Sequence, residues 1–208
     1  MEVHFRGANC ILVTTKEARI VVDDNLADLG GKSVTKAGDI ALFTMAHADP
    51  AQATKLTIDQ PGEYEVSGVS IYGIAARGTM DEAKQKTATM YKIIFDDRRL
   101  LITGHIYPEL SDEQLETIGM VDVMFVPVGG NGFTLDGIGA LKLIKKIEPK
   151  LVIPVHYDSS GPNYSVPQQT LEQALQALTM EIKETRPTLK LKSHEFGDTT
   201  QLIVLEQA

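Results

Sequence analysis

The sequence predicts an α+β fold, arranged as a four-layer αββα sandwich with two sheets back to back and helices outside. Two observations favour this. The first half of the 208 residues is rich in short runs of Val, Ile, Tyr and Thr between turn residues, which is typical of strands. The second half alternates between helical and strand patterns. Strand-rich segments that each end in a helix and a strand favour paired sheets covered by helices.

The first half is expected to contain short strands separated by turns such as Pro61-Gly62. We expect six of them, at residues 3–5, 10–14, 19–23, 40–43, 55–58 and 69–74. Two further strands, 89–95 and 100–103, are expected to form a hairpin across the polar residues 96–99.

The second half is expected to alternate helices with buried strands. Ser111 is expected to cap a short helix that Gly119 closes. Residues 135–147 place most apolar side chains three or four apart, with lysines on the other side, so a helix is expected there. The remaining expected elements are a helix at 171–180 and strands at 121–126, 151–155, 189–191 and 201–205.

Composition bounds the class of protein. With 43% apolar residues the chain is long enough for one substantial core, so a single domain over residues 1–208 is expected. The net charge is −8 and no stripe of Lys or Arg is present, so no nucleic acid partner is expected. Cys10 is the one cysteine, which fits the reducing cytoplasm. No apolar run approaches the roughly 20 residues of a membrane span, so no membrane association is expected.

The stretch FTMAHADPA, residues 43–51, follows an apolar strand and carries candidate metal ligands. His47 and Asp49 supply an imidazole and a carboxylate two residues apart in the loop that leaves the strand. Zinc takes nitrogen and carboxylate ligands, and a catalytic zinc also needs a position open to water. This loop is therefore the first candidate for a site.

Three longer segments resemble the metallo-β-lactamase superfamily, in its branch of small UlaG-like and predicted Zn-dependent hydrolases. Residues 9–24 resemble the opening hairpin of that family, which ends in an aspartate, here matched by Asp23. Residues 58–74 resemble the segment after the metal loop, and residues 110–157 resemble the branch almost throughout. The resemblance implies the αββα metallo-β-lactamase fold and a metal-dependent hydrolase activity.

The family's T-H-x-H-x-D-H loop carries metal ligands that this chain matches only in part. His47 matches the second loop histidine and Asp49 the loop aspartate. Met45 and Pro50 stand at the outer two histidines, where thioether and proline are poor or absent ligands for zinc. His156, in the segment Ile-Pro-Val-His-Tyr, matches the final histidine of the family.

The family's H-L-G-D segment is matched less well. Its histidine falls on Gly104 and its bridging aspartate on Tyr107. His105 lies one residue out of register, and such a slip at a strand end can turn a side chain to the other face. His105 could still turn into the site, and Glu109 could offer a carboxylate nearby.

The resemblance therefore implies an incomplete site that holds at most one ion of zinc or another divalent metal. The expected ligands are His47 and His156 with one of Asp49 and His105, and Asp49 is the candidate catalytic residue, as general base. The expected substrate is a small ester, lactone or phosphoester. The alternative is a catalytically inactive binding or assembly module without metal, in which His47 and His156 only bond the surrounding loops. A homo-oligomer is left open.

Other polar segments are given structural roles. Residues 129–132 are expected to form a tight turn near the site, and residues 158–164 a connecting loop. Asp122 is expected as a charge at a sheet edge and Asp136 as a helix-start residue.

Overall fold

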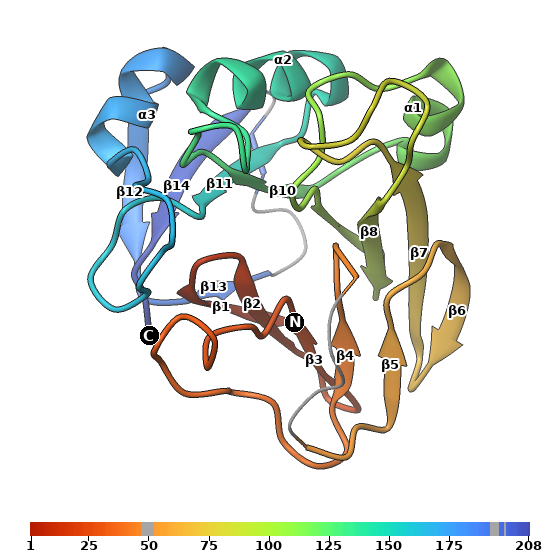
Figure 1. The fold of residues 1–208 in the computed structure, drawn as a ribbon. Helices are drawn as coiled ribbons and strands as arrows, with labels where there is room; N and C mark the ends of the chain where they lie inside the picture. Colours follow the sequence, from red (N-terminus) through yellow and green to blue (C-terminus); the bar gives the residue numbers. More distant parts are fainter. Residues whose placement is uncertain (47–51, 192–195, 198) are drawn as a thin grey trace.

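The computed structural model describes residues 1–46, 52–191, 196–197 and 199–208. Two β-sheets and three helices make up the described part (Figure 1). The six-stranded sheet has the order β13 (Leu189–Lys190), β1 (Glu2–Gly7), β2 (Cys10–Thr14), β3 (Arg19–Val22), β4 (Ile40–Leu42) and β5 (Leu56–Ile58). The eight-stranded sheet has the order β12 (Ile182–Arg186), β14 (Gln201–Leu205), β11 (Leu151–Val155), β10 (Val123–Pro127), β9 (Arg98–Ile102), β8 (Ala88–Phe95), β7 (Val69–Ala76) and β6 (Gly62–Val66).

The main hydrophobic core draws side chains from both sheets and from the helices. Strand β1 shows the alternation that builds it, because Val3 and Phe5 are buried in the core while His4 and Arg6 are only partly buried. The helices α1 (Asp112–Ile118), α2 (Gly137–Ile147) and α3 (Leu171–Leu178) lie together on the outer side of the eight-stranded sheet (Figure 1). The predicted α+β arrangement, with two sheets packed back to back, is thus confirmed.

The outer face of the six-stranded sheet is covered differently from what was expected. A second, smaller core cluster joins Cys10, Leu12 and Val21 of this sheet to Leu26 of the long connection between β3 and β4. In the described part of the chain, the connection at residues 24–39 covers this face, and all three helices lie on the other sheet. The fourth layer is therefore a loop here.

Two strands escaped prediction, and both are edges of the eight-stranded sheet. Strand β6 has the sequence GEYEV and β12 the sequence IKETR, and charged side chains of both are exposed. Charged residues are common on edge strands because they discourage pairing with another chain. The same residues hide the hydrophobic pattern that would reveal a strand.

The sequence predicts a hairpin turn that includes Asp96 and Asp97, and a helix start at Asp136. Asp96 and Asp97 have φ of 53° and 60° and form a two-residue hairpin turn, shorter than the four residues expected. Asp136 caps α2 by accepting a hydrogen bond from the Gly139 N–H at 2.7 Å, as predicted.

The expectation for Asp122 was wrong. Its side chain is 4% exposed, and it lies between two cations and not at a sheet edge. Its carboxylate is 3.0 Å from Arg99 Nε and 3.2 Å from Lys150 Nζ. Burial alone would raise the pKa of Asp122, but hydrogen bonds from Arg99 and Lys150 outweigh it and hold that pKa below its ordinary value.

A helix can span a membrane only if it is long enough and apolar enough. Within the ranges that the structure describes, none of the helices has both the length and the apolar character needed to cross a membrane.

Candidate active site

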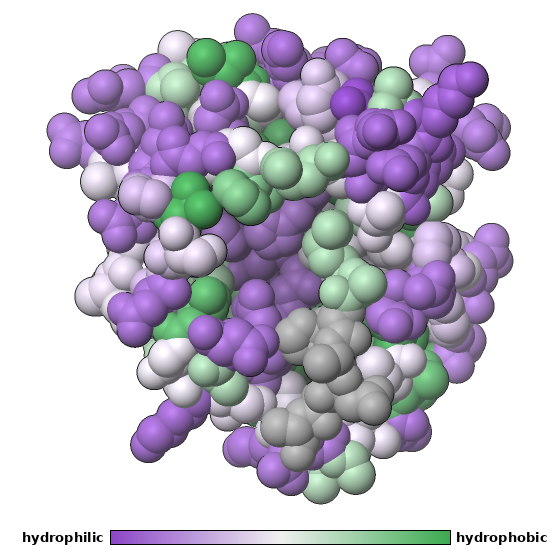
Figure 2. Space-filling view, viewed as in Figure 1, coloured by the Kyte–Doolittle hydropathy of each residue, from purple (hydrophilic) through white to green (hydrophobic). Residues whose placement is uncertain are grey.

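The sheet topology gathers several chain segments at one end of the sandwich. Strands β9, β10 and β11 are neighbours and run parallel, so their carboxyl ends lie at the same edge. His105 follows β9, and His156 follows β11 directly. A pocket of about 360 Å³ lies at this edge, and Thr44 and Met45, which follow β4 of the other sheet, also line it. Figure 2 shows a hollow on this face with hydrophilic residues in its floor and hydrophobic ones along part of its border.

His105 and His156 meet in this pocket. Their ring centroids are 4.8 Å apart and the rings stand at 90°, edge to face. The open question about His105 is thereby answered, because its imidazole turns into the pocket that His156 lines. The backbone of His156 is left-handed, with φ of 52°, and its N–H donates to the Ala8 carbonyl at 2.8 Å. This bond fixes the turn that directs the ring.

Each imidazole has its Nδ1 atom facing an oxygen acceptor. His105 Nδ1 lies 3.2 Å from the Phe133 carbonyl, and His156 Nδ1 lies 3.2 Å from Gln168 Oε1. The Gln168 amide is oriented by its own nitrogen, which donates to the Val166 carbonyl at 2.8 Å. Because both acceptors can only accept, each Nδ1 carries a proton, and in a neutral imidazole Nε2 then keeps its lone pair. This is the tautomer of a histidine that binds a metal through Nε2.

Burial keeps His156 neutral. Its side chain is almost fully buried, and burial, with a smaller contribution from the charge of His105, lowers the pKa of His156 to about 3. A neutral imidazole is the form that ligates a metal ion. His156 also contacts the Tyr164 ring at a centroid distance of 4.9 Å.

Asp23 connects the two strands that lead to the pocket from the six-stranded sheet. It follows β3, and its carboxylate accepts hydrogen bonds from the Thr44 N–H at 2.7 Å, the Thr44 hydroxyl at 2.6 Å and the Asn9 amide. Burial raises the pKa of Asp23, and the bonds from Thr44 oppose this without cancelling it. Asp23 therefore positions Thr44, which precedes residues 47–51 in the sequence.

Gly104, which matches a family histidine, cannot carry a side chain here. It has φ of +63°, and a Cβ atom added to it would lie 2.4 Å from the Thr44 Cβ. Position 104 therefore offers no ligand, and His105 is the residue of this segment that reaches the pocket.

Tyr107 and Glu109 do not take part in the pocket. The Tyr107 ring lies under the Arg77 guanidinium, 3.9 Å from its Cζ atom, and lines a separate cavity. Glu109 is exposed and is not among the described residues that line the pocket, so the carboxylate expected from it is absent there.

The other two predicted ligands, His47 and Asp49, lie outside the described residues. In the part of the chain that the structure describes, no three residues among His, Cys, Asp and Glu are grouped so that they could hold a metal ion. Of the predicted ligands, His105 and His156 are the two that lie among the described residues and line the pocket, together with Met45 and Ala46, which precede position 47 in the sequence.

Sequence reasoning missed the residues at the pocket mouth. Phe133 and Met80 line the pocket, and they are 50% and 69% exposed. Thr79 links their loops, since its hydroxyl donates to the Phe133 carbonyl at 2.9 Å and its N–H donates to the His105 carbonyl at 3.0 Å. The only sign of these residues in the sequence was that Phe133 and Met80 are each an apolar residue within a largely polar segment.

Comparisons with known proteins agree with this architecture. A protein of Pyrococcus abyssi named as a UPF0173 metal-dependent hydrolase is 26% identical over 170 residues, which cover 79% of this chain and 73% of that protein. A crystal structure from Thermotoga maritima, of a protein placed in the metallo-β-lactamase superfamily, superposes with a TM-score of 0.75 at 21% identity and covers 99% of this chain and 98% of that one. A metallo hydrolase of Ignicoccus hospitalis superposes with a TM-score of 0.58 at 18% identity, covering 92% and 99%.

The family assignment rests on the sequence match. The sequence model of the β-lactamase superfamily domain matches residues 2–156, which include both histidines of the pocket. The chain belongs to the metallo-β-lactamase superfamily.

Proposed function

We propose that this protein is a metal-dependent hydrolase that holds a single divalent metal ion. The observation that carries the proposal is the contact between His105 and His156, each with Nδ1 bonded to a fixed oxygen. The name of the Pyrococcus abyssi relative, a metal-dependent hydrolase, supports it.

The donors in the pocket fit a site for one ion. His105 and His156 would supply two neutral imidazoles through Nε2, and a third ligand would come from His47 or Asp49, which follow Thr44 in the sequence. Zinc suits this donor set, as in the UlaG-like proteins that the sequence resembles. A bound zinc ion would lower the pKa of a water molecule and so supply the nucleophile for hydrolysis. A second ion has poor support, because Tyr107 at the position of the bridging aspartate stacks on Arg77.

The pocket lining favours a neutral substrate with an apolar group. Among the described residues that line the pocket there is no Lys or Arg, while Asp23 and Asp81 contribute carboxylates. A phosphoester dianion would therefore meet no side-chain cation there. Phe133 and Met80 offer an apolar surface at the mouth. We infer that an ester or lactone with an apolar substituent fits better than a phosphoester.

The residues themselves would orient this substrate and keep the ligands in place. The Phe133 carbonyl holds the proton of His105 Nδ1, and the Phe133 side chain stands at the mouth. Asp49 stays the candidate general base.

We also infer one domain, because the main core cluster contains residues from Val3 to Leu205 and from both sheets.

The second candidate function is a catalytically inactive binding module. The observation that favours it is Met45, which replaces a family histidine, lines the pocket and packs against the main core. A thioether there adds apolar surface where a ligand would be needed. The hydrolase requires metal for turnover, whereas the binding module shows no turnover with or without metal.

Turnover of small esters tests the proposal. Protein stripped with a chelating resin should hydrolyse p-nitrophenyl butyrate at the background rate, and one equivalent of Zn²⁺ or Mn²⁺ should restore the activity. His156→Ala should stay inactive with metal, whereas the control His4→Ala, on the partly buried face of β1, should regain it. Activity that is unaffected by stripping, or absent in every metal-loaded sample, would contradict the hydrolase.

A further inference from the structure

A second cavity, of about 730 Å³, lies on the outer face of the six-stranded sheet. Its walls are the connection at residues 24–39, the outward side chains of β1 to β3, and residues 161–162 and 207–208. Figure 1 shows the end of the chain beside this connection. It shares none of its lining residues with the candidate active site.

The charge of this cavity is opposite to that of the whole chain. The chain has a net charge of −8, yet every charged side chain that lines the cavity is a cation. These are Arg6, Arg19, Lys32 and Lys36. A concave surface with cations on several walls raises the local concentration of anions.

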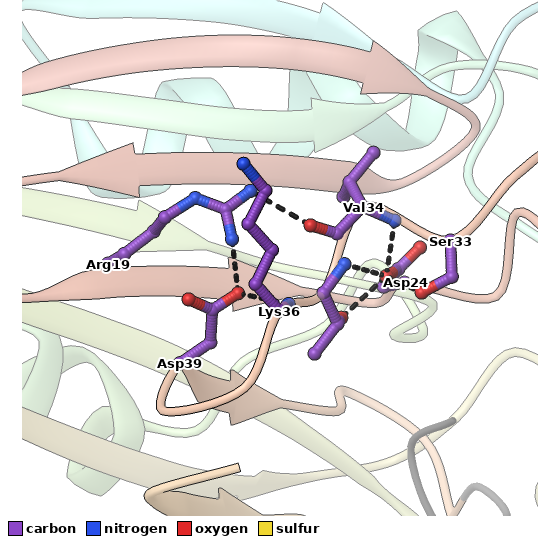
Figure 3. Close-up of polar contacts among 7 residues, drawn as sticks. Arg19, Asp24, Ser33, Val34, Lys36 and Asp39 are labelled. Atoms are coloured by element: carbon purple, nitrogen blue, oxygen red, sulfur yellow. Dashed lines mark hydrogen bonds and ion pairs between the residues drawn. The ribbon is translucent and has the colours of Figure 1, made fainter. Parts of the chain in front are cut away.

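Most of these cations form no ion pair within the described part of the chain. Arg19 donates to Asp39 and, at 2.8 Å, to the Val34 carbonyl (Figure 3). Within the described residues, the side chains of Arg6, Lys32 and Lys36 form no ion pair with any carboxylate, including that of Ala208. The Arg6 Nε atom is buried and has no hydrogen-bond partner among the residues that the structure describes. Three cations therefore line one cavity, and none of them is in an ion pair with a described carboxylate.

The connection that carries the two lysines is held in place by acidic side chains. Asp24 Oδ2 accepts from the Ser33 hydroxyl at 2.6 Å, the Val34 N–H at 2.8 Å, and the N–H and hydroxyl of Thr35 at 2.7 and 2.5 Å (Figure 3). Asp39 accepts from the Lys36 N–H at 2.7 Å. Neither aspartate lines the cavity. The carboxylates thus fix the loop backbone and leave the lysine charges for a ligand, which reduces the ordering cost of binding.

We propose that this cavity binds a small multivalent anion that carries phosphate or carboxylate groups. Three cations from β1 and the connection, none of them in an ion pair with a described carboxylate, match a ligand with two or more negative groups, and the guanidinium of Arg6 offers paired donors to one of them. The cavity is large enough for a ligand of this kind. The proposal does not depend on the hydrolase function.

Calorimetric titration with two probes, inorganic pyrophosphate and citrate, tests the site. The protein is first stripped of metal, because both probes also bind metal ions. We expect saturable binding of at least one probe with one site per chain, weakened severalfold when NaCl is raised from 0.05 to 0.5 M. Arg6→Gln and Lys36→Gln should each weaken binding about tenfold. Tighter binding of pyrophosphate would assign phosphate ligands, and tighter binding of citrate would assign carboxylates.

Two controls locate the binding. Lys145→Gln removes the same charge from an exposed position on α2, far from the lining residues, and should change the affinity less than twofold. Thermal unfolding without anion should show that all variants are folded. An unchanged affinity in the Arg6→Gln, Lys36→Gln double variant, equal weakening by Lys145→Gln, or no saturable binding of either probe would overturn the proposal.

Discussion

Thr44 occupies the space that a side chain at Gly104 would need, with its Cβ atom 2.4 Å from the position of an added Cβ. Thr44 follows β4 of the six-stranded sheet and Gly104 follows β9 of the eight-stranded sheet. Their contact therefore joins the two sheets beside the pocket that Thr44 lines. Thr44 cannot easily yield, because Asp23 binds both its N–H and its hydroxyl. The contact explains why the imidazole of this segment comes from position 105.

Gly104→Ala should therefore destabilise the fold by about 2–4 kcal/mol, through overpacking in addition to the strain of a positive φ. Gly38→Ala is the matched control, since Gly38 has φ of +85° and nothing lies within 4 Å of an added Cβ. It should lose only about 1 kcal/mol. Urea unfolding of both variants measures the difference. Equal losses would show that Thr44 gives way.

The pH dependence of stability should report the burial of His156. In metal-free protein its pKa is about 3, below the ordinary 6.5, so between these values the unfolded chain binds a proton that the folded chain does not. The stability that the buried, neutral His156 contributes is fully present above pH 6.5 and is lost as the pH falls toward 3.

His156→Gln removes this titration and keeps a polar side chain. The free energy of unfolding of the natural chain should fall toward acid more steeply than that of the variant, by up to about 1.4 kcal/mol per pH unit. Urea unfolding of both proteins from pH 7.5 to pH 4 gives the difference, in which other groups cancel. Parallel curves would mean that the folded protein admits the imidazolium.

Asp24 should be worth more to stability than its partial exposure suggests. Asp24→Ala removes the acceptor of four hydrogen bonds that hold residues 33–35, so a loss of about 2–3 kcal/mol is expected. The control Asp28→Ala, at an exposed position of the same connection, should change stability by less than about 0.5 kcal/mol. Chemical unfolding checks both, and similar values would show that the loop does not depend on Asp24.

The pocket mouth should decide preference among esters. Phe133→Ala and Met80→Ala should raise KM for p-nitrophenyl butyrate about fivefold and leave the acetate ester nearly unchanged, because only the longer chain reaches the apolar surface. Met120→Ala is the control, since Met120 is 71% exposed and does not line the pocket. A uniform change for both esters would instead indicate a distorted site.

The fold was predictable from the sequence because most strands and helices bury a regular apolar face. The β10 run VMFVP and the alternation in β1 show this directly. The edge strands β6 and β12 were not predictable, because charged residues interrupt their pattern. The cover formed by residues 24–39 was also missed, since few apolar residues, such as Leu26, anchor it.

The site was predictable in part. The resemblance pointed to His156, and the structure brings His105 to it, although strict register placed Gly104 there. The register at a strand end depends on how the chain packs beyond the last hydrogen bond between the strands. The residues next to it in sequence do not determine that packing. Phe133 reaches the pocket from a separate loop, so only the tertiary fold reveals it.

Metal content tests the central claim most directly. Elemental analysis of protein purified without added metal should find about one zinc or other divalent ion per chain, retained in His4→Ala and lost in the His105→Ala, His156→Ala double variant. The same metal content in the double variant, or no metal in the natural chain even after incubation with Zn²⁺, would contradict a metal centre built on these two histidines.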